Sequence, residues 1–194
     1  MKKGVKIRKN FGPKTWLVPM PVLIIASYDE KGTANAMNVA WGGISEYEEI
    51  SICISKEHKT TQNILLSKAF TISFATENFV KECDYVGIVS AHNIPNKLEK
   101  INFTTKKSDF VNAPIINQLP MTLECKFLSY DEKTEILKGK IINISASEEI
   151  LENNKISLEK LKPIIFNPIN NSYYVVGKKI GDAFKEGKKI DHFK

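Results

Sequence analysis

The feature that most constrains this chain is a short, strongly apolar segment followed at once by a turn signature. Residues 22–28 are mostly apolar and rich in β-branched side chains, which is typical of a buried strand. Residues 29–32 (Asp-Glu-Lys-Gly) form a turn signature that ends in glycine. Residues 33–39 then resume as an antiparallel partner, so the sequence predicts a β-hairpin.

The same strand–turn–strand pattern recurs along the chain. Residues 121–128 alternate cleanly, a turn follows at 131–134, and residues 136–145 return as the second arm of another hairpin. Further strands are expected at residues 50–55, 70–74 and 173–176, and short helices at residues 60–66, 77–85 and 96–100. Residues 1–20 are expected to be irregular, and residues 87–117 are only weakly patterned. The pattern favours a mainly β fold, a small barrel with helices covering its ends.

The length and composition fit one globular domain. The chain has 194 residues, of which 42% are hydrophobic and 26% are charged. We therefore expect a single domain over residues 1–194, with a core at about 15–180 and a loosely held C-terminal tail from residue 177.

Charge and cysteine usage exclude several classes of function. The formal net charge is +6, but Arg8 is the only arginine, so the lysine excess favours a solubilising surface over nucleic-acid binding. The three cysteines form no Cys-x-x-Cys pair, so neither a disulfide framework nor a metal site is expected. The longest apolar run, residues 22–26, is too short to cross a membrane, and no signal segment is evident. A cytoplasmic protein is expected.

One segment after the first turn could contact a flat ligand. It consists of Asn35, Ala36, Met37, Asn38, Val39, Ala40 and Trp41, followed by Gly42 and Gly43. Small residues let a backbone approach a ligand closely, and asparagine amides both donate and accept hydrogen bonds. Trp41 could pack near an aromatic ring. The alternative interpretation is a hairpin arm followed by a glycine-rich turn.

A second segment has the chemistry of a phosphate site. It contains Ser55, His58, Lys59, Thr60, Thr61 and, one residue further, Asn63. The segment follows a predicted strand and opens a predicted helix, whose N-terminus exposes unsatisfied amides and partial positive charge. The alternative is a threonine cap on a helix with solvated lysine neighbours.

A third, weaker candidate lies in the poorly patterned middle of the chain. Ser90, and Lys97 a short loop later, could close over an anionic ligand. The alternative is a flexible surface loop.

Several short motifs occur in a fixed order around these segments. They are Pro19-Met20-Pro21-Val22; Gly32, Asn35 and Trp41; Lys59-Thr60 with Asn63-Ile64; Phe70 to Phe74; Asp84, Gly87 and Ser90; Ala113-Pro114-Ile115-Ile116; Leu123-Glu124-Cys125; Leu161 to Ile164; and Tyr173 to Gly177. Their order and spacing, over about residues 15–180, resemble the flavin-reductase-like family, the FMN-binding split barrels of flavoredoxin type.

The resemblance implies a split β-barrel of Greek-key character that forms a homodimer with FMN near the interface. The backbone from Asn35 to Trp41 would contact the flavin ring, and the region from His58 to Thr61 would hold the phosphate, with Ser90 and Lys97 nearby. Two departures stand out. Residues 96–98 (Asn-Lys-Leu) replace the family's Asp-Lys-Phe, and His58 or Lys59 must stand in for an arginine before the phosphate-binding threonine.

The function implied is that of an FMN-dependent oxidoreductase, in which FMN takes electrons from NADH, NADPH or a protein donor and passes them to an acceptor. No catalytic side chain is required for this. The alternatives are an electron carrier that has a redox protein partner and no nicotinamide site, a flavin-binding module without turnover, and other split barrels that handle haem or pyridoxine phosphate. Cys53 could face the flavin, but a core position is the expectation for a free cysteine.

Overall fold

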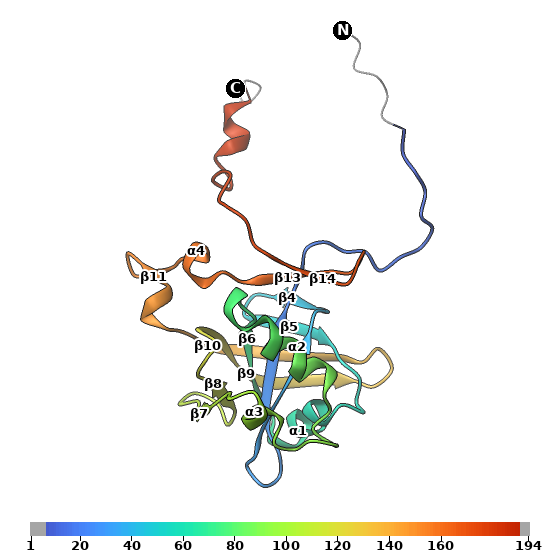
Figure 1. The fold of residues 1–194 in the computed structure, drawn as a ribbon, viewed down its shortest axis with the longest axis vertical. Coiled ribbons are helices and arrows are strands. Elements are labelled where there is room, and N and C mark those ends of the chain that lie inside the picture. The colour runs from blue at the N-terminus through green and yellow to red at the C-terminus, as the bar shows by residue number, and fades with distance from the viewer. Residues whose placement is uncertain (1–6, 191–194) are drawn as a thin grey trace.

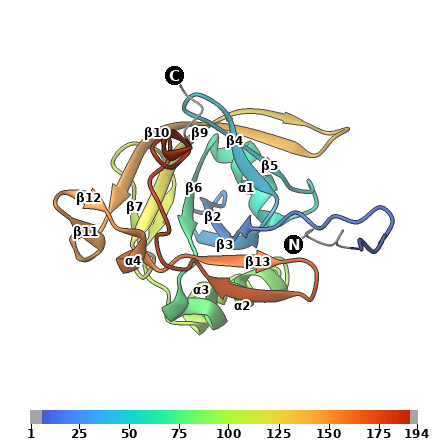
Figure 2. The same ribbon diagram turned by 90° about the horizontal axis from the view of Figure 1, so that it is seen from above.

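The computed structural model describes residues 7–190 and is built on one curled, antiparallel, seven-stranded sheet. Its strands follow the order β3-β2-β6-β9-β10-β5-β4, so β3 and β4 form its two edges. The strands are β2 (Leu23–Tyr28), β3 (Ala34–Val39), β4 (Gly42–Glu46), β5 (Glu49–Cys53), β6 (Ala69–Phe74), β9 (Met121–Asp131) and β10 (Ile136–Ala146). Seen from above in Figure 2, this sheet curls into a half-barrel.

Smaller elements surround this sheet. The shorter strands are β1 (Met20–Pro21), β13 (Ile164–Asn167) and β14 (Ser172–Val175) in one sheet, β7 (Thr105–Lys107) with β8 (Pro114–Ile116), and β11 (Leu151–Glu152) with β12 (Lys155–Ile156). The α-helices are α1 (Lys59–Ser67), α2 (Val80–Ile88), α3 (Lys97–Lys100) and α4 (Leu158–Leu161), and 3-10 turns lie at Glu77–Phe79, Glu148–Ile150 and Glu186–Lys189.

The core lies on both faces of the sheet. Because side chains alternate along a strand, β2 sends Ile25 to one face and Ile24 to the other, and both are fully buried. Ile25 joins a cluster inside the curl that includes Phe70 and Leu137. Ile24 joins a second cluster beneath α2 that includes Val86. Burial on both faces explains why the sequence of β2 is continuously apolar instead of alternating.

The two hairpins predicted from the sequence are confirmed. Strand β2 pairs with β3, and β9 pairs with β10. The interpretation of Gly42 and Gly43 as a turn is wrong, because these residues begin β4 and pair with β5. A Cβ atom on Gly42 would lie 3.1 Å from Leu23 Cδ1, so that glycine permits close packing against β2. Strand β13 was also not expected.

Two arms extend from the body of the molecule. Residues 7–19 contain no helix or strand and are exposed throughout, which confirms the irregular lead-in for this part; residues 1–6 lie outside the described range. Residues 174–190 are likewise exposed throughout. Figure 1 shows both arms leaving the body on the same side, above β13 and β14. Across residues 7–190, none of the helices is long and apolar enough to span a membrane.

Candidate functional site

Edge strand β3 links two cavities of opposite character. Asn35, near its beginning, lines a polar cavity of about 380 Å³. Ala40 and Trp41, just beyond its end, line an apolar cavity of about 560 Å³. Asn35 and Ala40 are five residues apart along the chain, so at about 3.3 Å per residue they lie roughly 17 Å apart. An elongated ligand with one apolar and one polar end would therefore lie along this strand.

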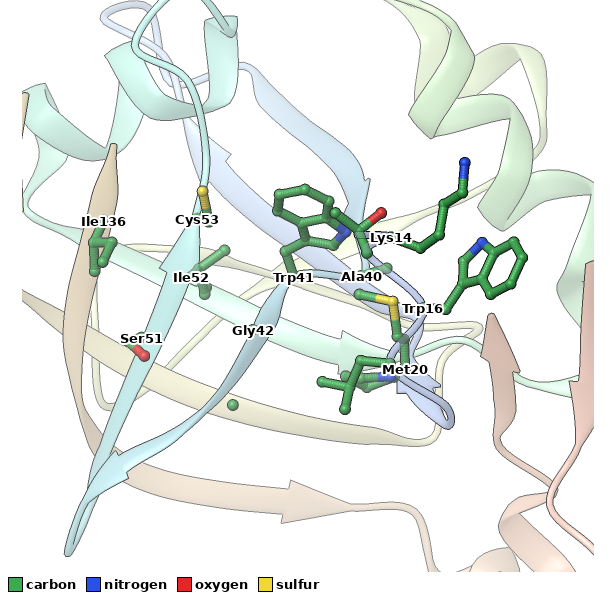
Figure 3. A pocket seen from close by; sticks show the side chains of 14 residues that line it. Lys14, Trp16, Met20, Ala40, Trp41, Gly42, Ser51, Ile52, Cys53 and Ile136 are labelled. Atoms are coloured by element: carbon green, nitrogen blue, oxygen red, sulfur yellow. The ribbon is translucent and has the colours of Figure 1, made fainter. Parts of the chain in front are cut away.

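The apolar cavity lies on the outer surface of the sheet. Trp41 lies beside Cys53 of β5 on one side, and Trp16 of the N-terminal arm lies on the other, as Figure 3 shows. Its floor is formed by small residues of paired strands, among them Gly43 and Ser51. Small side chains between two tryptophans leave room for a flat ring, and Trp41 itself is still 51% exposed.

Cys53 is exposed in this cavity, so the expectation that it is a core thiol is wrong. It is the last residue of β5, directly opposite Ile136 of β10, and its amide donates a 2.8 Å hydrogen bond to the Trp41 carbonyl. The alternation of β5 buries Ile50 and Ile52 and leaves Cys53 on the outer face. Cys83 and Cys125 are buried, and burial raises the pKa of each thiol to about 12.

The polar cavity lies where the β2–β3 turn, the start of α1 and the loop after α2 meet. Asn35, Lys59 and Asn63 line it, together with Ala91 and His92 of that loop. His58 is the N-cap of α1, and its side chain makes no capping hydrogen bond. The first amides of α1 are therefore not capped by that side chain, which is the usual condition for binding an anion at a helix N-terminus.

Three buried side chains at this end have hydrogen-bonding atoms without partners. Among residues 7–190, the unpartnered buried polar side-chain atoms are Ser27 Oγ, Asn35 Oδ1 and both amide atoms of Asn63. Ser27 lies directly opposite Asn35 across the β2–β3 ladder. Unsatisfied buried polar groups are costly, so their concentration at one place indicates a ligand that both donates and accepts hydrogen bonds. This observation fits the ribityl hydroxyls and phosphate of FMN.

The threonines of the predicted phosphate segment are largely buried and already bonded. Thr60 Oγ1 accepts a 2.8 Å hydrogen bond from Asn35 Nδ2, and Thr61 Oγ1 donates a 2.7 Å hydrogen bond to the Ser55 carbonyl. Lys59 Nζ lies 3.1 Å from Glu30 Oε2 on the turn after β2. The structure thus brings Asn35, Lys59, Thr60 and Asn63 together around one helix N-terminus.

Lys97 is placed differently from what the sequence suggested. Only 2% of this residue is exposed, and its Nζ donates hydrogen bonds to the carbonyls of Val86 (2.9 Å) and Val89 (2.7 Å). These carbonyls lie at the C-terminal end of α2, where a cation is favourable. Burial lowers the Lys97 pKa to about 8. Its ammonium therefore holds the loop that carries the exposed Ser90, instead of pointing into the polar cavity.

That loop is tied back to the start of α1 by His92. The His92 Nε2 atom lies 3.2 Å from the Glu57 carbonyl, within hydrogen-bonding distance. His92 and Ser27 were not among the site residues expected from the sequence. The predicted bounds of the first hairpin place Ser27 opposite Ala34, one residue from its observed partner Asn35, whereas nothing in the sequence places His92 against residue 57.

Asn38 has a structural partner on the other face of β3. Its Nδ2 donates a 3.1 Å hydrogen bond to the Cys83 carbonyl on α2. A Cβ atom on Gly87 would lie 2.9 Å from Asn38 Cβ, so the glycine lets α2 pack closely on β3. Tyr173 OH donates a 2.8 Å hydrogen bond to Asp84. Burial, as the larger cause, and this hydrogen bond together raise the Tyr173 pKa to about 12. Asn38 therefore holds α2 against the strand.

Comparison with known proteins gives a consistent picture. Residues 16–167 match the family model described as the flavin reductase like domain. The flavoredoxin of Desulfovibrio vulgaris (Miyazaki F) is similar in structure, with 30% identity and a TM-score of 0.89 over 93% of this chain and 100% of that one.

Two further similarities extend this picture. A flavoredoxin from Methanosarcina acetivorans is 27% identical, with a TM-score of 0.83 over 96% of this chain and 99% of that one. An uncharacterized protein of Aquifex aeolicus (strain VF5) is 24% identical over 172 residues, which cover 82% of this chain and 85% of that protein.

Proposed function

This chain belongs to the flavin-reductase-like family, and on that premise we propose that it is an FMN-dependent oxidoreductase. Its fold is the mainly β split barrel that the sequence predicted. Family membership supports a flavin-binding protein of oxidoreductase type. We propose specifically that the flavin is FMN and that the electron donor is NADH, NADPH or a protein.

The observation that carries the proposal is the pairing of the two cavities along β3. The apolar cavity beside Trp41 suits a flat aromatic ring, and the polar cavity beside Asn35 presents unpartnered amides next to a helix N-terminus. FMN has these two ends in this order, a ring at one and a phosphate at the other. We propose that the ring lies against residues 36–41 and the phosphate against the first turn of α1.

The residues of the chain bind and orient the cofactor in this proposal. Asn63 and Asn35 supply buried amide atoms, and Lys59 supplies positive charge. The edge of β3 offers backbone donors and acceptors to the rim of the ring, because no strand among residues 7–190 pairs with that edge. Bound FMN would supply the electron-transfer chemistry itself. Trp41 and Trp16 would exclude water from the ring.

The proposal includes a cytoplasmic homodimer. The ring cavity is open on its outer side, where the exposed side chains of Trp41, Leu17 and Ile136 surround it. Contiguous apolar surface of this kind marks an interaction site in a soluble protein. A second copy would cover it and place the flavin near the interface.

Purified protein tests this directly. We expect it to be yellow, to release FMN on denaturation, and to lose its visible flavin absorbance when mixed anaerobically with NADH or NADPH. A colourless protein that fails to bind added FMN would refute the flavin assignment. A yellow protein that neither nucleotide reduces would refute a nicotinamide-dependent reductase and leave the flavin site standing.

A second candidate is a flavin-based electron carrier without its own nicotinamide activity. The similarity to two flavoredoxins at 30% and 27% identity favours it, since it extends over nearly the whole of each chain. The same anaerobic experiment separates the two. Reduction by a protein donor but not by either nucleotide identifies the carrier.

A further inference from the structure

The C-terminal arm has features of a docked segment beyond the point where it leaves the body. Residues 174–176 bond to residues 163–165, and residues 176–181 line a cavity together with residues 152–159. In the described part of the chain, no hydrogen bond or ion pair joins residues 182–190 to the body. Every residue from Tyr174 to Ile190 is exposed, including Ile180 and Phe184, each 94% exposed. The arm is nevertheless ordered locally by ion pairs between Lys179 and Asp182 and between Lys189 and Glu186. A single helical turn is marginal in water without packing, so a surface that packs against the arm would explain this order.

Most of both arms lies within the region matched to one solved relative. The body from Met20 to Val175 makes up about 80% of the 194 residues, whereas the similarity to the Methanosarcina flavoredoxin covers 96% of the chain. The matched region therefore includes most of both arms. Residues 182–190, which make no bond to the body, would keep a common course only if another surface held them. A second copy of the same chain is a partner available to each of these proteins, so it is the simplest surface to hold the arm.

The β4–β5 hairpin is a complementary surface. Its tip carries Glu46, Glu48 and Glu49, and none of these makes an ion pair among residues 7–190. Ile44 and Tyr47 are 69% and 87% exposed on the same hairpin. Apolar side chains beside three carboxylates match the composition of the arm.

On the arm, three lysines remain outside the internal ion pairs. They are Lys178, Lys185 and Lys188, and within the described part of the chain none has an acidic partner within 4.0 Å. The hairpin and the arm thus present equal numbers of opposite charges, each set beside two exposed apolar side chains.

We propose that the C-terminal arm of one copy binds the β4–β5 hairpin of a second copy, with Ile180 and Phe184 against Ile44 and Tyr47. Two-fold symmetry makes the exchange reciprocal, so each copy gives one arm and receives one. Because β4 begins at Gly42, directly after Trp41, the exchanged arm would brace the strand that forms one wall of the ring cavity. This inference rests on the homodimer proposed above.

A charge-reversal experiment on the full chain tests the contact. One variant carries Glu46→Lys, Glu48→Lys and Glu49→Lys, another carries Lys178→Glu, Lys185→Glu and Lys188→Glu, and a third combines all six. Sedimentation measures the dimer dissociation constant, and the FMN content of each sample is measured in parallel. We expect each three-residue reversal alone to raise the dimer dissociation constant at least about tenfold, and the six-residue combination to restore it.

Two further variants separate apolar contact from charge. Ile180→Asp with Phe184→Asp should weaken the dimer as the charge reversals do, whereas Leu66→Asp, an exposed apolar residue of α1, should leave it unchanged. The proposed contact would be overturned if neither charge reversal changed the dimer dissociation constant, or if the parent protein were a monomer. It would also be overturned if both reversals weakened the dimer but the combined variant did not restore it. The contact would likewise be overturned if the protein bound anionic vesicles through its C-terminal arm while the arm variants left the dimer dissociation constant unchanged. Full FMN content in those samples would leave the flavin function intact.

Discussion

Asn35 Nδ2 donates a 2.8 Å hydrogen bond to Thr60 Oγ1, and both residues are buried. The bond joins the beginning of edge strand β3 to the first turn of α1. It fixes the distance between the strand proposed to contact the flavin ring and the helix terminus proposed to hold the phosphate. The same bond leaves Asn35 Oδ1 without a partner and available to a ligand.

Replacing Thr60 by valine should therefore destabilise the protein beyond the loss of one hydrogen bond. The change keeps the shape and removes the oxygen, so the buried Asn35 Nδ2 loses its acceptor. We expect the free energy of unfolding to fall by about 1–3 kcal/mol in urea titrations. Thr33→Val, at an exposed position, is the control and should change it by less than about 0.5 kcal/mol. Equal stability of the two variants would contradict the importance of the bond.

Removing Lys59 and Thr60 together should weaken flavin retention. The double change to alanine deletes a cation and a hydroxyl at the start of α1, and we expect FMN to bind about 2–4 kcal/mol more weakly in fluorescence titrations. Lys126→Ala with Thr134→Ala, two exposed positions on β9 and its following turn, changes the net charge equally. If the Lys59/Thr60 variant purified with full flavin, the phosphate would have to bind elsewhere.

Gly87→Ala should loosen the packing of α2 on β3. Alanine favours a helix over glycine by about 1 kcal/mol, but its Cβ would lie 2.9 Å from Asn38 Cβ. We expect overpacking to dominate and the protein to lose about 1–3 kcal/mol of stability. Gly43→Ala, where a Cβ meets nothing within 4 Å, is the control for thermal unfolding. A stabilised Gly87→Ala variant would show that α2 shifts freely on β3.

Lys97→Met should mobilise the loop over the polar cavity. Methionine matches the length of lysine but leaves the carbonyls of Val86 and Val89 without their donor. We expect faster amide exchange confined to residues 89–96, and FMN affinity lower by about 1 kcal/mol. Lys100→Met, on the exposed side of the same short helix, should change neither. Weaker FMN binding with unchanged exchange would indicate instead that the ammonium contacts the cofactor directly.

We expect the two buried thiols to make the free energy of unfolding fall with rising pH. The pKa values of Cys83 and Cys125 are raised from 9.0 to about 12, so above pH 9 the unfolded chain loses protons that the folded chain keeps. We expect each thiol to remove about 1.4 kcal/mol of unfolding free energy between pH 8 and 10. Cys125→Ala should show a correspondingly shallower decline. In the folded protein at pH 8, a thiol reagent should modify Cys53 alone.

Local sequence signals predicted much of the fold. The two hairpins follow from apolar runs joined by turn residues, and α1 follows from a strand that ends just before a threonine pair. Strand β4 was missed because Gly42 and Gly43 look like a turn when the neighbouring strand that requires small residues is unknown. Strand β13 was missed because it is short and follows Pro163, and because its partner β1 lies far away in the sequence. Its other partner, β14, follows after residues 168–171, but this short connection carries no strong apolar alternation.

The candidate site was predictable only where its contacts follow from local order. Asn35 and Thr60 were expected in the site from their separate segments, but the bond between them depends on how α1 packs beside β3. Lys97 was expected near an anion because its charge is visible in the sequence, whereas its burial against the α2 carbonyls depends on the tertiary path of the loop. Cys53 was expected inside because the alternation of a strand does not identify which face is covered.

The free edge of β3 affects how the newly made chain behaves before a flavin is bound. Residues 34–39 include neither a proline nor a charged side chain, the two devices that usually discourage one sheet from adding to another. A newly made chain without flavin would offer this edge as a template for self-association. Flavin supply during synthesis would then govern how much of the protein reaches a soluble form, so the cofactor would act as a folding partner as well as a redox group.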